Sequence, residues 1–562
     1  MLYDCVACNI LGVTARRFKP SDLVDFAVVG SGAAGGVMAR ELSQAGFSVV
    51  VLEQGPRFGP GDFEHDDLKY NFLSGICNDP ASSPQTFRDD PGIDAKRPHM
   101  GNSLVYARMV GGSSNHFTAN FWRFHDIDFR ERSALGAIAG TGFADWPISY
   151  QELEPYYTKV EWEVGVSGLA HASPFDPPRS KSYPMPPLPV KSSGALFESG
   201  ARKLGLHPFP APMAINSQLY RGRPGCAHCG FCIGFGCEVM AKSSSLYTMI
   251  PEAEATGRCE IRPRSYVFHI DTNAQGRTTG VTYFDADKRE HFQKARAVVV
   301  SANGAETARL LLNSTSARFP QGVANSSGLI GKYLMFNQGA GVHAVFEQEL
   351  NEYKSVQVTR ILHDFYDSDP KRGFYGGGGI DARMGSQPIG WALASGGDLP
   401  HWGIDYKNRL EAFRRSMLSS SHCTSLAVES NSVSIDPVLK DAWGVPAIRV
   451  TYKDHPDDLA VAAFLQQRSF EIMHAAGAQQ VWKAEPRISR GGVHLLGTCR
   501  MGDSPADSVV DKYHRTHDVP NLFLCDGSSF VTSGRGQPTM TIQALAFRAA
   551  DHIGRFAKRN EI

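Results

Sequence analysis

The chain has 562 residues, of which 42% are hydrophobic and 20% are charged, and its 57 basic residues balance its 57 acidic residues. The length allows several domain-sized units, and the charge balance excludes a strongly basic, nucleic-acid-binding protein. No apolar run approaches the roughly 18 residues that a membrane-spanning helix needs.

The first twenty residues carry their Arg16-Arg17 pair after a short apolar run, which is the wrong order for a secretory signal. We therefore expect a cytoplasmic location. Cys5 and Cys8 form a CxxC pair in this segment, but no second ligand pair is adjacent. A poorly ordered leader is favoured there over a metal site.

Residues 26–36 form an apolar run that breaks into glycines. The pattern predicts a strand and a phosphate-binding loop, followed by a helix over 37–45. Gly30 would allow the tight turn, Gly32 would let the backbone approach a pyrophosphate, and Gly35 would let the helix pack closely on the strand. The N-terminal N–H groups of the helix would then face the phosphates.

A second apolar run, 47–52, ends at Glu53, which lies 18 positions after Gly35. This is close to the spacing at which a carboxylate meets an adenosine ribose hydroxyl. The alternative is a glycine turn without a ligand, but strand, helix and acid agree on a dinucleotide-binding domain.

The next part of the chain has less regular patterning. Residues 56–101 are rich in Asp, Pro and Gly and predict long surface excursions, which end at a second glycine loop, 108–117. A helix is predicted over 149–165, and the Pro-rich segment 172–189 is interpreted as a crossing linker.

A second strand, loop and helix follow at 294–313. Between 332 and 488 the pattern changes to strand-like runs, at 341–346, 426–435 and 447–452, with a helix at 459–476. This change predicts a second, sheet-based domain inserted into the first. The strand at 522–527 and the helix at 538–557 return to the nucleotide domain.

Four cysteines are clustered with the spacing C-x2-C-x2-C-x4-C, at Cys226, Cys229, Cys232 and Cys237. The spacing is near that of ferredoxin loops, in which glycines let several thiolates converge. It indicates a metal site, iron-sulfur or structural zinc, with free thiols as a further alternative. Two disulfides would need an oxidising compartment that the sequence does not indicate.

Four ordered motifs together resemble the glucose-methanol-choline (GMC) oxidoreductases, from about residue 22 to the end: the first glycine loop, 111–114, 304–307 and 494–502. The resemblance implies FAD and an α/β fold, α+β overall, in which a Rossmann-type FAD-binding domain is interleaved with an antiparallel-sheet substrate domain. The implied division gives 22–150, 238–331 and 489–562 to the FAD-binding domain and 151–237 and 332–488 to the substrate domain. Within the family, 145–150 and the histidine of the second loop look most like the branch of pyranose oxidase and bacterial FAD-dependent glucose and glucoside dehydrogenases.

The resemblance also implies site residues. Those expected to hold the cofactor are Gly30, Gly32, Gly35 and Glu53 at the ADP half, Val267 at the adenine, Gly112, Ser113 and Ser114 at the flavin, and Asp526 near the ribityl phosphate. His116 corresponds to the histidine that carries the flavin covalently in pyranose oxidase, although a histidine that merely packs on the ring is the favoured interpretation.

Oxidation of an alcohol needs a base, because the flavin accepts only the hydride. His494 is the best candidate, since imidazole is neutral near physiological pH and can accept a proton. His494 also lies in a glycine-flanked turn, which suits an exposed functional residue. The family's second His or Asn is replaced by Gln537, which cannot titrate but can donate to the substrate oxygen. Pro538 would begin the following helix and point its positive end toward the flavin.

Members of the sugar dehydrogenase branch carry a cluster near the cysteines, so the resemblance favours iron-sulfur, either 3Fe-4S or 4Fe-4S. A one-electron cluster favours a dehydrogenase of sugars or glycosides, acting on a secondary hydroxyl, with a cytochrome or quinone acceptor. Such relatives often work with a small subunit that carries the export signal, which would allow co-export to the periplasm. An oxygen-using oxidase and an electron carrier without its own substrate remain alternatives.

Overall fold

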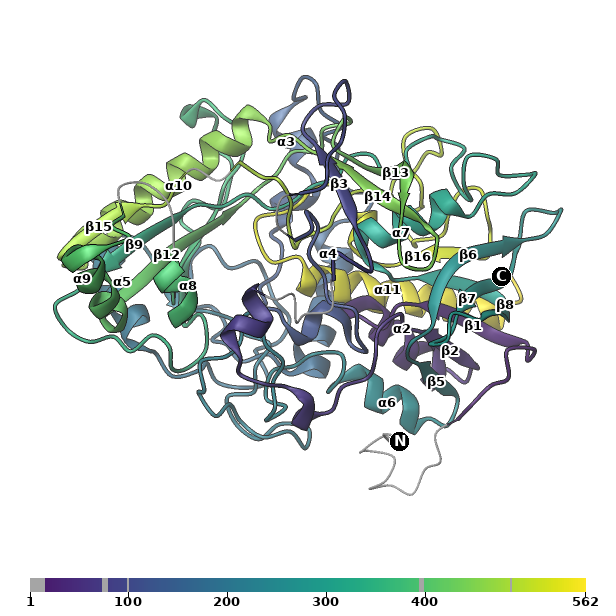
Figure 1. Cartoon of the computed structure of the whole chain (residues 1–562), viewed down its shortest axis with the longest axis horizontal. Helices are drawn as coiled ribbons and strands as arrows, with labels where there is room; N and C mark the ends of the chain where they lie inside the picture. The colour runs from purple at the N-terminus through teal and green to yellow at the C-terminus, as the bar shows by residue number, and fades with distance from the viewer. Residues whose placement is uncertain (1–15, 73–78, 99–100, 394–398, 486–487) are drawn as a thin grey trace.

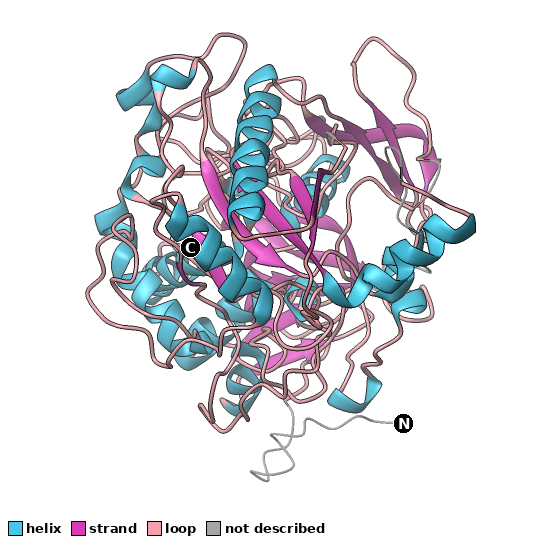
Figure 2. Cartoon of the chain, turned by 90° about the vertical axis from the view of Figure 1, so that its left-hand side faces the viewer, coloured by secondary structure: helices cyan, strands magenta, loops and turns pink. Residues whose placement is uncertain are grey.

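The computed structural model of the chain describes residues 16–72, 79–98, 101–393, 399–485 and 488–562. Cys5 and Cys8 lie outside these residues. Two large groups of strands lie side by side, one toward each end of the molecule, and the helices cover their faces (Figures 1 and 2).

The first group is a seven-stranded sheet in the spatial order β5, β2, β1, β8, β7, β6, with β16 paired to the C-terminal part of β8 on the edge opposite β1. Its strands are β1 (Val24–Val29), β2 (Val49–Leu52), β5 (Cys259–Arg262), β6 (Tyr266–Thr272), β7 (Thr278–Phe284), β8 (Glu290–Val300) and β16 (Leu522–Leu524). The pairs that join β5, β2, β1, β8 and β16 are parallel, whereas β6, β7 and β8 form an antiparallel meander. This is the parallel, helix-covered sheet that the nucleotide motif predicts.

Helices bury the parallel part of this sheet. α2 (Ala33–Gln44) connects β1 to β2 and contacts α6 (Met249–Ala255) and α11 (Thr539–Lys558). β2 has the sequence VVVL and is buried along its whole length, as expected of a strand covered on both faces. α2 begins earlier than the predicted helix, because the backbone turns into the helix directly after Gly32. α7 (Asn303–Asn313) follows β8 as predicted.

The second group is a six-stranded sheet in which every pair is antiparallel, in the order β15, β9, β12, β11, β10, β4. Its strands are β4 (Phe209–Pro210), β9 (Gly341–Val345), β10 (Arg360–Leu362), β11 (Gly378–Arg383), β12 (Ser416–Cys423) and β15 (Gln480–Lys483). The helices α10 (Pro456–Ala475) and α5 (Ser192–Lys203) pack on it. The predicted antiparallel sheet is therefore present, and the predicted strand at 341–346 and helix at 459–476 are confirmed.

The predicted strand at 447–452 and the end of the predicted strand at 426–435 lie in a small third sheet, not in the second sheet. β3 (Gln85–Arg88) arises from the expected surface excursion and pairs in parallel with β14 (Pro446–Thr451), which pairs with β13 (Ser432–Lys440). It joins segments that the predicted domain division separates. Likewise α4 (Tyr150–Val160), which begins at a capping box on Ser149, packs against α11. The domain boundaries therefore remain a division that we propose.

None of the helices that the structure describes is long and apolar enough to cross a membrane.

Candidate functional site

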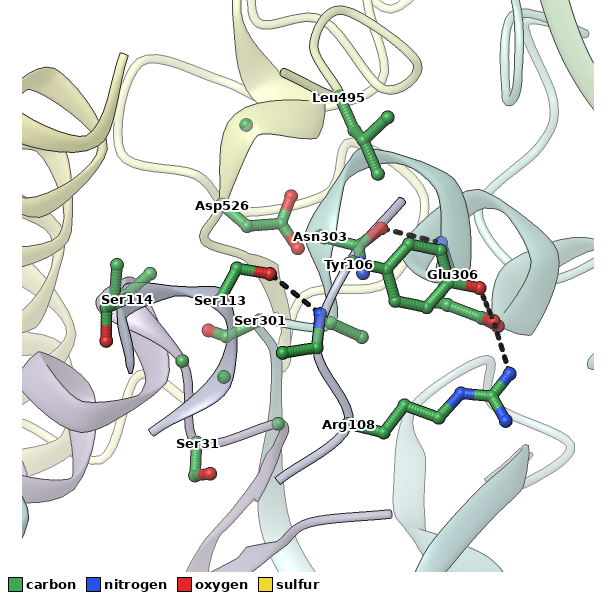
Figure 3. A pocket seen from close by; sticks show the side chains of 18 of the residues that line it. Ser31, Tyr106, Arg108, Ser113, Ser114, Ser301, Asn303, Glu306, Leu495 and Asp526 are labelled. Atoms are coloured by element: carbon green, nitrogen blue, oxygen red, sulfur yellow. Dashed lines mark hydrogen bonds and ion pairs between the residues drawn. The ribbon is translucent and has the colours of Figure 1, made fainter. Parts of the chain in front are cut away.

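A cavity of about 490 Å³ lies where the first sheet, the second glycine loop and the segment before α11 meet. Figure 3 shows side chains from these segments pointing toward one space, among them Ser113, Ser301 and Asp526. The volume is in the range of cofactor and ligand pockets. The following predicted residues line it: Gly30, Gly32, Glu53, Gly112, Ser113, Ser114, His116, Val267, His494, Asp526 and Gln537.

The first glycine loop has the close contacts that its motif requires. Gly30 has φ +91°, and a Cβ there would lie 2.5 Å from the carbonyl oxygen of Ser301. Gly35 does not line the cavity, but a Cβ at this position would lie 2.0 Å from the carbonyl oxygen of Gly30. A Cβ at Gly32 would have its nearest neighbour at 3.9 Å, the Cα of Gly112. The backbone at Gly32 is therefore open to a ligand, and the start of α2 faces the cavity.

The Glu53 carboxylate is buried beside this loop. It accepts hydrogen bonds from the Ser31 hydroxyl at 2.7 Å, from the Ser31 amide at 3.1 Å and from the Gly55 amide at 3.0 Å. Burial raises the pKa of Glu53, and these hydrogen bonds oppose the shift. Because a carboxylate has about four acceptor positions, one remains for a ribose hydroxyl in addition to these three bonds.

Arg108, a charged residue beside Glu53, was not predicted from the sequence as part of the site. Arg108 is buried, and its Nε and Nη2 atoms have no hydrogen-bond partner within the described residues. Its Nη2 lies 4.0 Å from Oε1 of Glu306, which also accepts a hydrogen bond from the Tyr106 hydroxyl (Figure 3). Although burial opposes it, Arg309 and Arg108 hold the pKa of Glu306 below its ordinary value.

Buried donors without partners need an explanation, and anionic or hydroxyl oxygens of a bound cofactor would supply it. Arg108 belongs to the second glycine loop, but no spacing rule assigns a role to an arginine three residues before a glycine pair. Only the fold brings it next to Glu53.

At the other side of the cavity lie the residues predicted to meet the flavin. The Ser113 hydroxyl accepts a hydrogen bond from the Ala107 amide at 3.0 Å, and the Ser114 hydroxyl donates to the Gly111 carbonyl at 2.6 Å. Asp526, on the turn after β16, accepts from the Thr307 hydroxyl at 2.6 Å. Burial raises the pKa of Asp526.

His116 is fixed by two neighbours. Its Nδ1 lies 3.0 Å from the carbonyl oxygen of Gly234 and its Nε2 lies 3.2 Å from the sulfur of Met109. Since a carbonyl only accepts, Nδ1 carries the proton. Burial, with a smaller effect of Lys242, lowers the pKa of His116 to about 4. The ring is therefore neutral, and a histidine that packs on the flavin, with covalent attachment as the alternative, stays the prediction.

The two predicted catalytic side chains share this cavity, although they lie far apart in the sequence. Nδ1 of His494 lies 2.8 Å from Oδ1 of Asn337. Gln537 precedes Pro538, which is the N-cap of α11 and not its predicted first residue, since the helix begins at Thr539. Pro538 and Thr539 also line the cavity. The N-terminal end of α11 therefore faces the space beside His494, as predicted, and stabilises negative charge there.

The four clustered cysteines lie in one loop that reaches the cavity through Ile233 and Gly234. All four are free thiols; Cys232 is buried and Cys229 is exposed. Burial and the neighbouring thiols raise the pKa of Cys226 to about 12 and, despite Lys242, that of Cys232 to about 11. Among the described residues, no group of three or more His, Cys, Asp or Glu side chains is arranged to hold a metal ion.

The surroundings of these thiols are nevertheless suited to an anionic group. The Lys242 ammonium is buried and donates to the carbonyls of Cys232 at 2.6 Å, Phe235 at 2.8 Å and Phe117 at 3.1 Å. Two backbone amides, of His228 and Lys242, donate to the sulfurs of Cys226 and Cys237. The metal site stays a prediction.

Comparison with known proteins identifies the class. The chain matches the GMC oxidoreductase family over residues 24–335, in its N-terminal part, and 427–546, in its C-terminal part. The chain belongs to this family. It is an FAD-dependent oxidoreductase that acts on CH–OH groups, and its glycine loop, Glu53 and the donors of Arg108 fit that cofactor.

Particular relatives cover almost the whole chain. A 2-methyl-1,2-propanediol dehydrogenase from Mycolicibacterium austroafricanum is 36% identical over 95% of this chain and 96% of its own length. The fructose dehydrogenase large subunit of Gluconobacter japonicus is 31% identical over 94% and 97%. Among solved structures, pyridoxine 4-oxidase from Mesorbium loti has a TM-score of 0.65 at 18% identity, covering 94% of this chain and 98% of its own, which shows the shared fold.

Proposed function

We propose that the protein is an FAD-dependent dehydrogenase that oxidises a hydroxyl, at a secondary carbon, of a sugar or glycoside. The observation that carries the proposal is that His494 and Gln537 line the same cavity as the residues suited to FAD. FAD, when bound, supplies the hydride acceptor.

In this proposal His494 accepts the proton of the substrate hydroxyl, and the amide of Gln537 donates a hydrogen bond that orients the same oxygen. The proposed cofactor contacts are Gly30, Gly32, Glu53, Gly112, Ser113, Ser114, His116, Val267 and Asp526. Gly35 would contribute indirectly, by letting α2 pack against Gly30. The positive end of α11 favours the negative charge that develops beside it.

We further assign Cys226, Cys229, Cys232 and Cys237 to an iron-sulfur cluster, which would supply one-electron transfer. Support comes from the buried Lys242 ammonium, which favours anionic thiolates, and from the contact of this loop with the cavity through Ile233 and Gly234. One relative is named as a large subunit, so a small partner subunit and a cytochrome or quinone acceptor belong to the proposal. Co-export with such a subunit would place the protein in the periplasm.

The test is the anaerobic visible spectrum of the purified protein, before and after addition of sugars, glycosides and small diols. The panel includes fructose and 2-methyl-1,2-propanediol, on which the names of two relatives say that they act. Bleaching of the flavin bands by one sugar or glycoside, together with a broad iron-sulfur absorption, supports the proposal. Bleaching by the small diol alone would replace the sugar with an aliphatic alcohol.

An oxygen-using oxidase is a second candidate, because paromamine 6'-oxidase of Streptomyces fradiae is 30% identical over 94% of this chain. Stoichiometric peroxide and no iron would select it.

A further inference from the structure

We propose that Asn337 is a positioning residue that sets the proton-accepting form of His494 and joins it to the loop that carries Gln537. The inference rests on the proposed role of His494 as the base. Asn337 lies before β9, far in sequence from both partners, and no motif marks it.

The orientation of the Asn337 amide follows from its other contacts. Its Nδ2 lies 3.2 Å from the carbonyl oxygen of Cys423, 3.3 Å from that of Ser533 and 3.1 Å from that of Gly534. Three acceptors surround this atom, so it is the nitrogen of the amide, and the oxygen faces His494.

The tautomer of His494 follows in turn. An amide oxygen only accepts, so the proton of the neutral ring lies on Nδ1, and the lone pair lies on Nε2. Nε2 is therefore the atom that takes the substrate proton. Without an acceptor at Nδ1 the ring would also populate the opposite tautomer, in which Nε2 carries a proton and cannot act as a base.

Asn337 also links the two proposed catalytic side chains. The carbonyls of Ser533 and Gly534 belong to the short loop that leads to Gln537 and α11. One side chain thus fixes the ring of His494 and the backbone from which Gln537 projects. Since positioning errors of about 1 Å reduce rates strongly, loss of this amide affects chemistry through both partners.

Within the part of the chain that the structure describes, the neighbouring His and Cys side chains are neutral and the neighbouring charged side chains are paired. From β12, burial keeps the pKa of His422 well below and that of Cys423 well above their ordinary values, so both are neutral. Behind His422, Asp381 is paired with Arg383. In the described part of the loop before α11, Arg535 is paired with Asp128 and Glu131, and on the cofactor side His116 is neutral.

The experiment measures the rate constant of substrate-dependent flavin reduction in anaerobic stopped flow, as a function of pH, with FAD content as the control for folding. In Asn337→Leu we expect a loss of roughly 10- to 100-fold, the range typical of a partner that orients a functional imidazole. In Asn337→Asp the oxygen that replaces Nδ2 meets three carbonyl oxygens, which raise the pKa of the new carboxyl group. Once ionised, the carboxylate faces Nδ1 and raises the pKa of His494. Because the base must be neutral, the acidic limb of the profile then moves up by about 1 pH unit or more.

Asn408→Asp, on the exposed surface of α9 (Gly403–Glu411), introduces the same charge away from the cavity and should leave the pH profile of flavin reduction unchanged.

A double-mutant cycle gives the decisive result. If Asn337 acts through His494, Asn337→Leu causes a clearly smaller loss in a His494→Ala background than in the wild type.

A full, multiplicative loss in that background, or an unshifted profile in Asn337→Asp, would overturn the inference. A wild-type rate constant of flavin reduction in the single variant His494→Ala would instead overturn the proposed function. The two failures are therefore distinguishable.

Discussion

Nδ1 of His116 donates a hydrogen bond to the carbonyl oxygen of Gly234 across 3.0 Å, and so joins the second glycine loop to the loop of clustered cysteines. The contact connects two segments more than one hundred residues apart at the wall of the cavity. Burial disfavours a second proton on the His116 ring, so protonating the ring in the folded chain costs free energy that can be measured.

The pKa of His116 in the folded chain is about 4, below its ordinary value of 6.5. Between these pH values the unfolded chain binds more protons, so stability falls as the pH drops from 6.5 toward 4. His116→Asn keeps a donor for Gly234 without a titrating group, and should remove roughly 2 kcal/mol of the loss in unfolding free energy between pH 7 and pH 5. Urea unfolding at both pH values measures this, and the exposed His474→Asn is the control. An equal pH dependence in His116→Asn and the wild type would contradict the assignment.

His494→Ala should slow flavin reduction by roughly 100- to 10,000-fold, because it removes the proposed general base. The protein should still bind FAD, since the first glycine loop is unchanged. Stopped-flow reduction under anaerobic conditions, with His474→Ala as the matched control, tests the prediction. Retention of the wild-type rate would exclude the base.

Gly35→Ala should destabilise the cofactor domain. The new Cβ would lie 2.0 Å from the Gly30 carbonyl oxygen, and such overpacking costs about 1–3 kcal/mol or more. A Cβ at Gly61 would have no neighbour within 4 Å, so Gly61→Ala is the control. The midpoint temperature of thermal unfolding and the FAD content should both fall in Gly35→Ala, and both should stay near the wild-type values in Gly61→Ala.

Arg108→Met should weaken FAD binding by about 10- to 100-fold, as expected for the loss of charge-assisted hydrogen bonds. Titration of the apoprotein with FAD gives the affinity. Arg289→Met, at an exposed ion pair with Asp287, provides the comparison. Unchanged affinity in Arg108→Met would mean that its unpartnered nitrogens do not face the cofactor.

Cys232→Ser should lower the iron and acid-labile sulfide content of the purified protein, whereas Cys259→Ser, at a buried thiol in β5, should not. Anaerobic metal analysis checks this directly. A wild-type protein without iron, purified without exposure to oxygen, would remove the cluster from the proposal and leave the flavin chemistry intact.

The sequence was informative where a local motif carries its own geometry. Gly30 and Gly35 occupy the close approaches that the glycine spacing requires, and the helix and strands after residue 332 follow hydrophobic periodicity. β3 could not be predicted, because a short strand that pairs with β14 more than 350 residues away has no local signal. Asn337 and Arg108 were missed for a similar reason, since their roles depend on partners that only the folded chain brings near.

The four hydrogen bonds of the Asn337 amide also bear on how a substrate reaches His494. They join β12, the loop before α11 and the histidine. Because Cys423 lies in the second sheet, moving that sheet with Asn337 away from His494 would break the other three bonds, at a cost of about 1.5–4.5 kcal/mol. Val493 borders the same cavity and is 66% exposed. We therefore expect the alcohol to enter beside Val493, because these hydrogen bonds oppose movement of the second sheet away from His494.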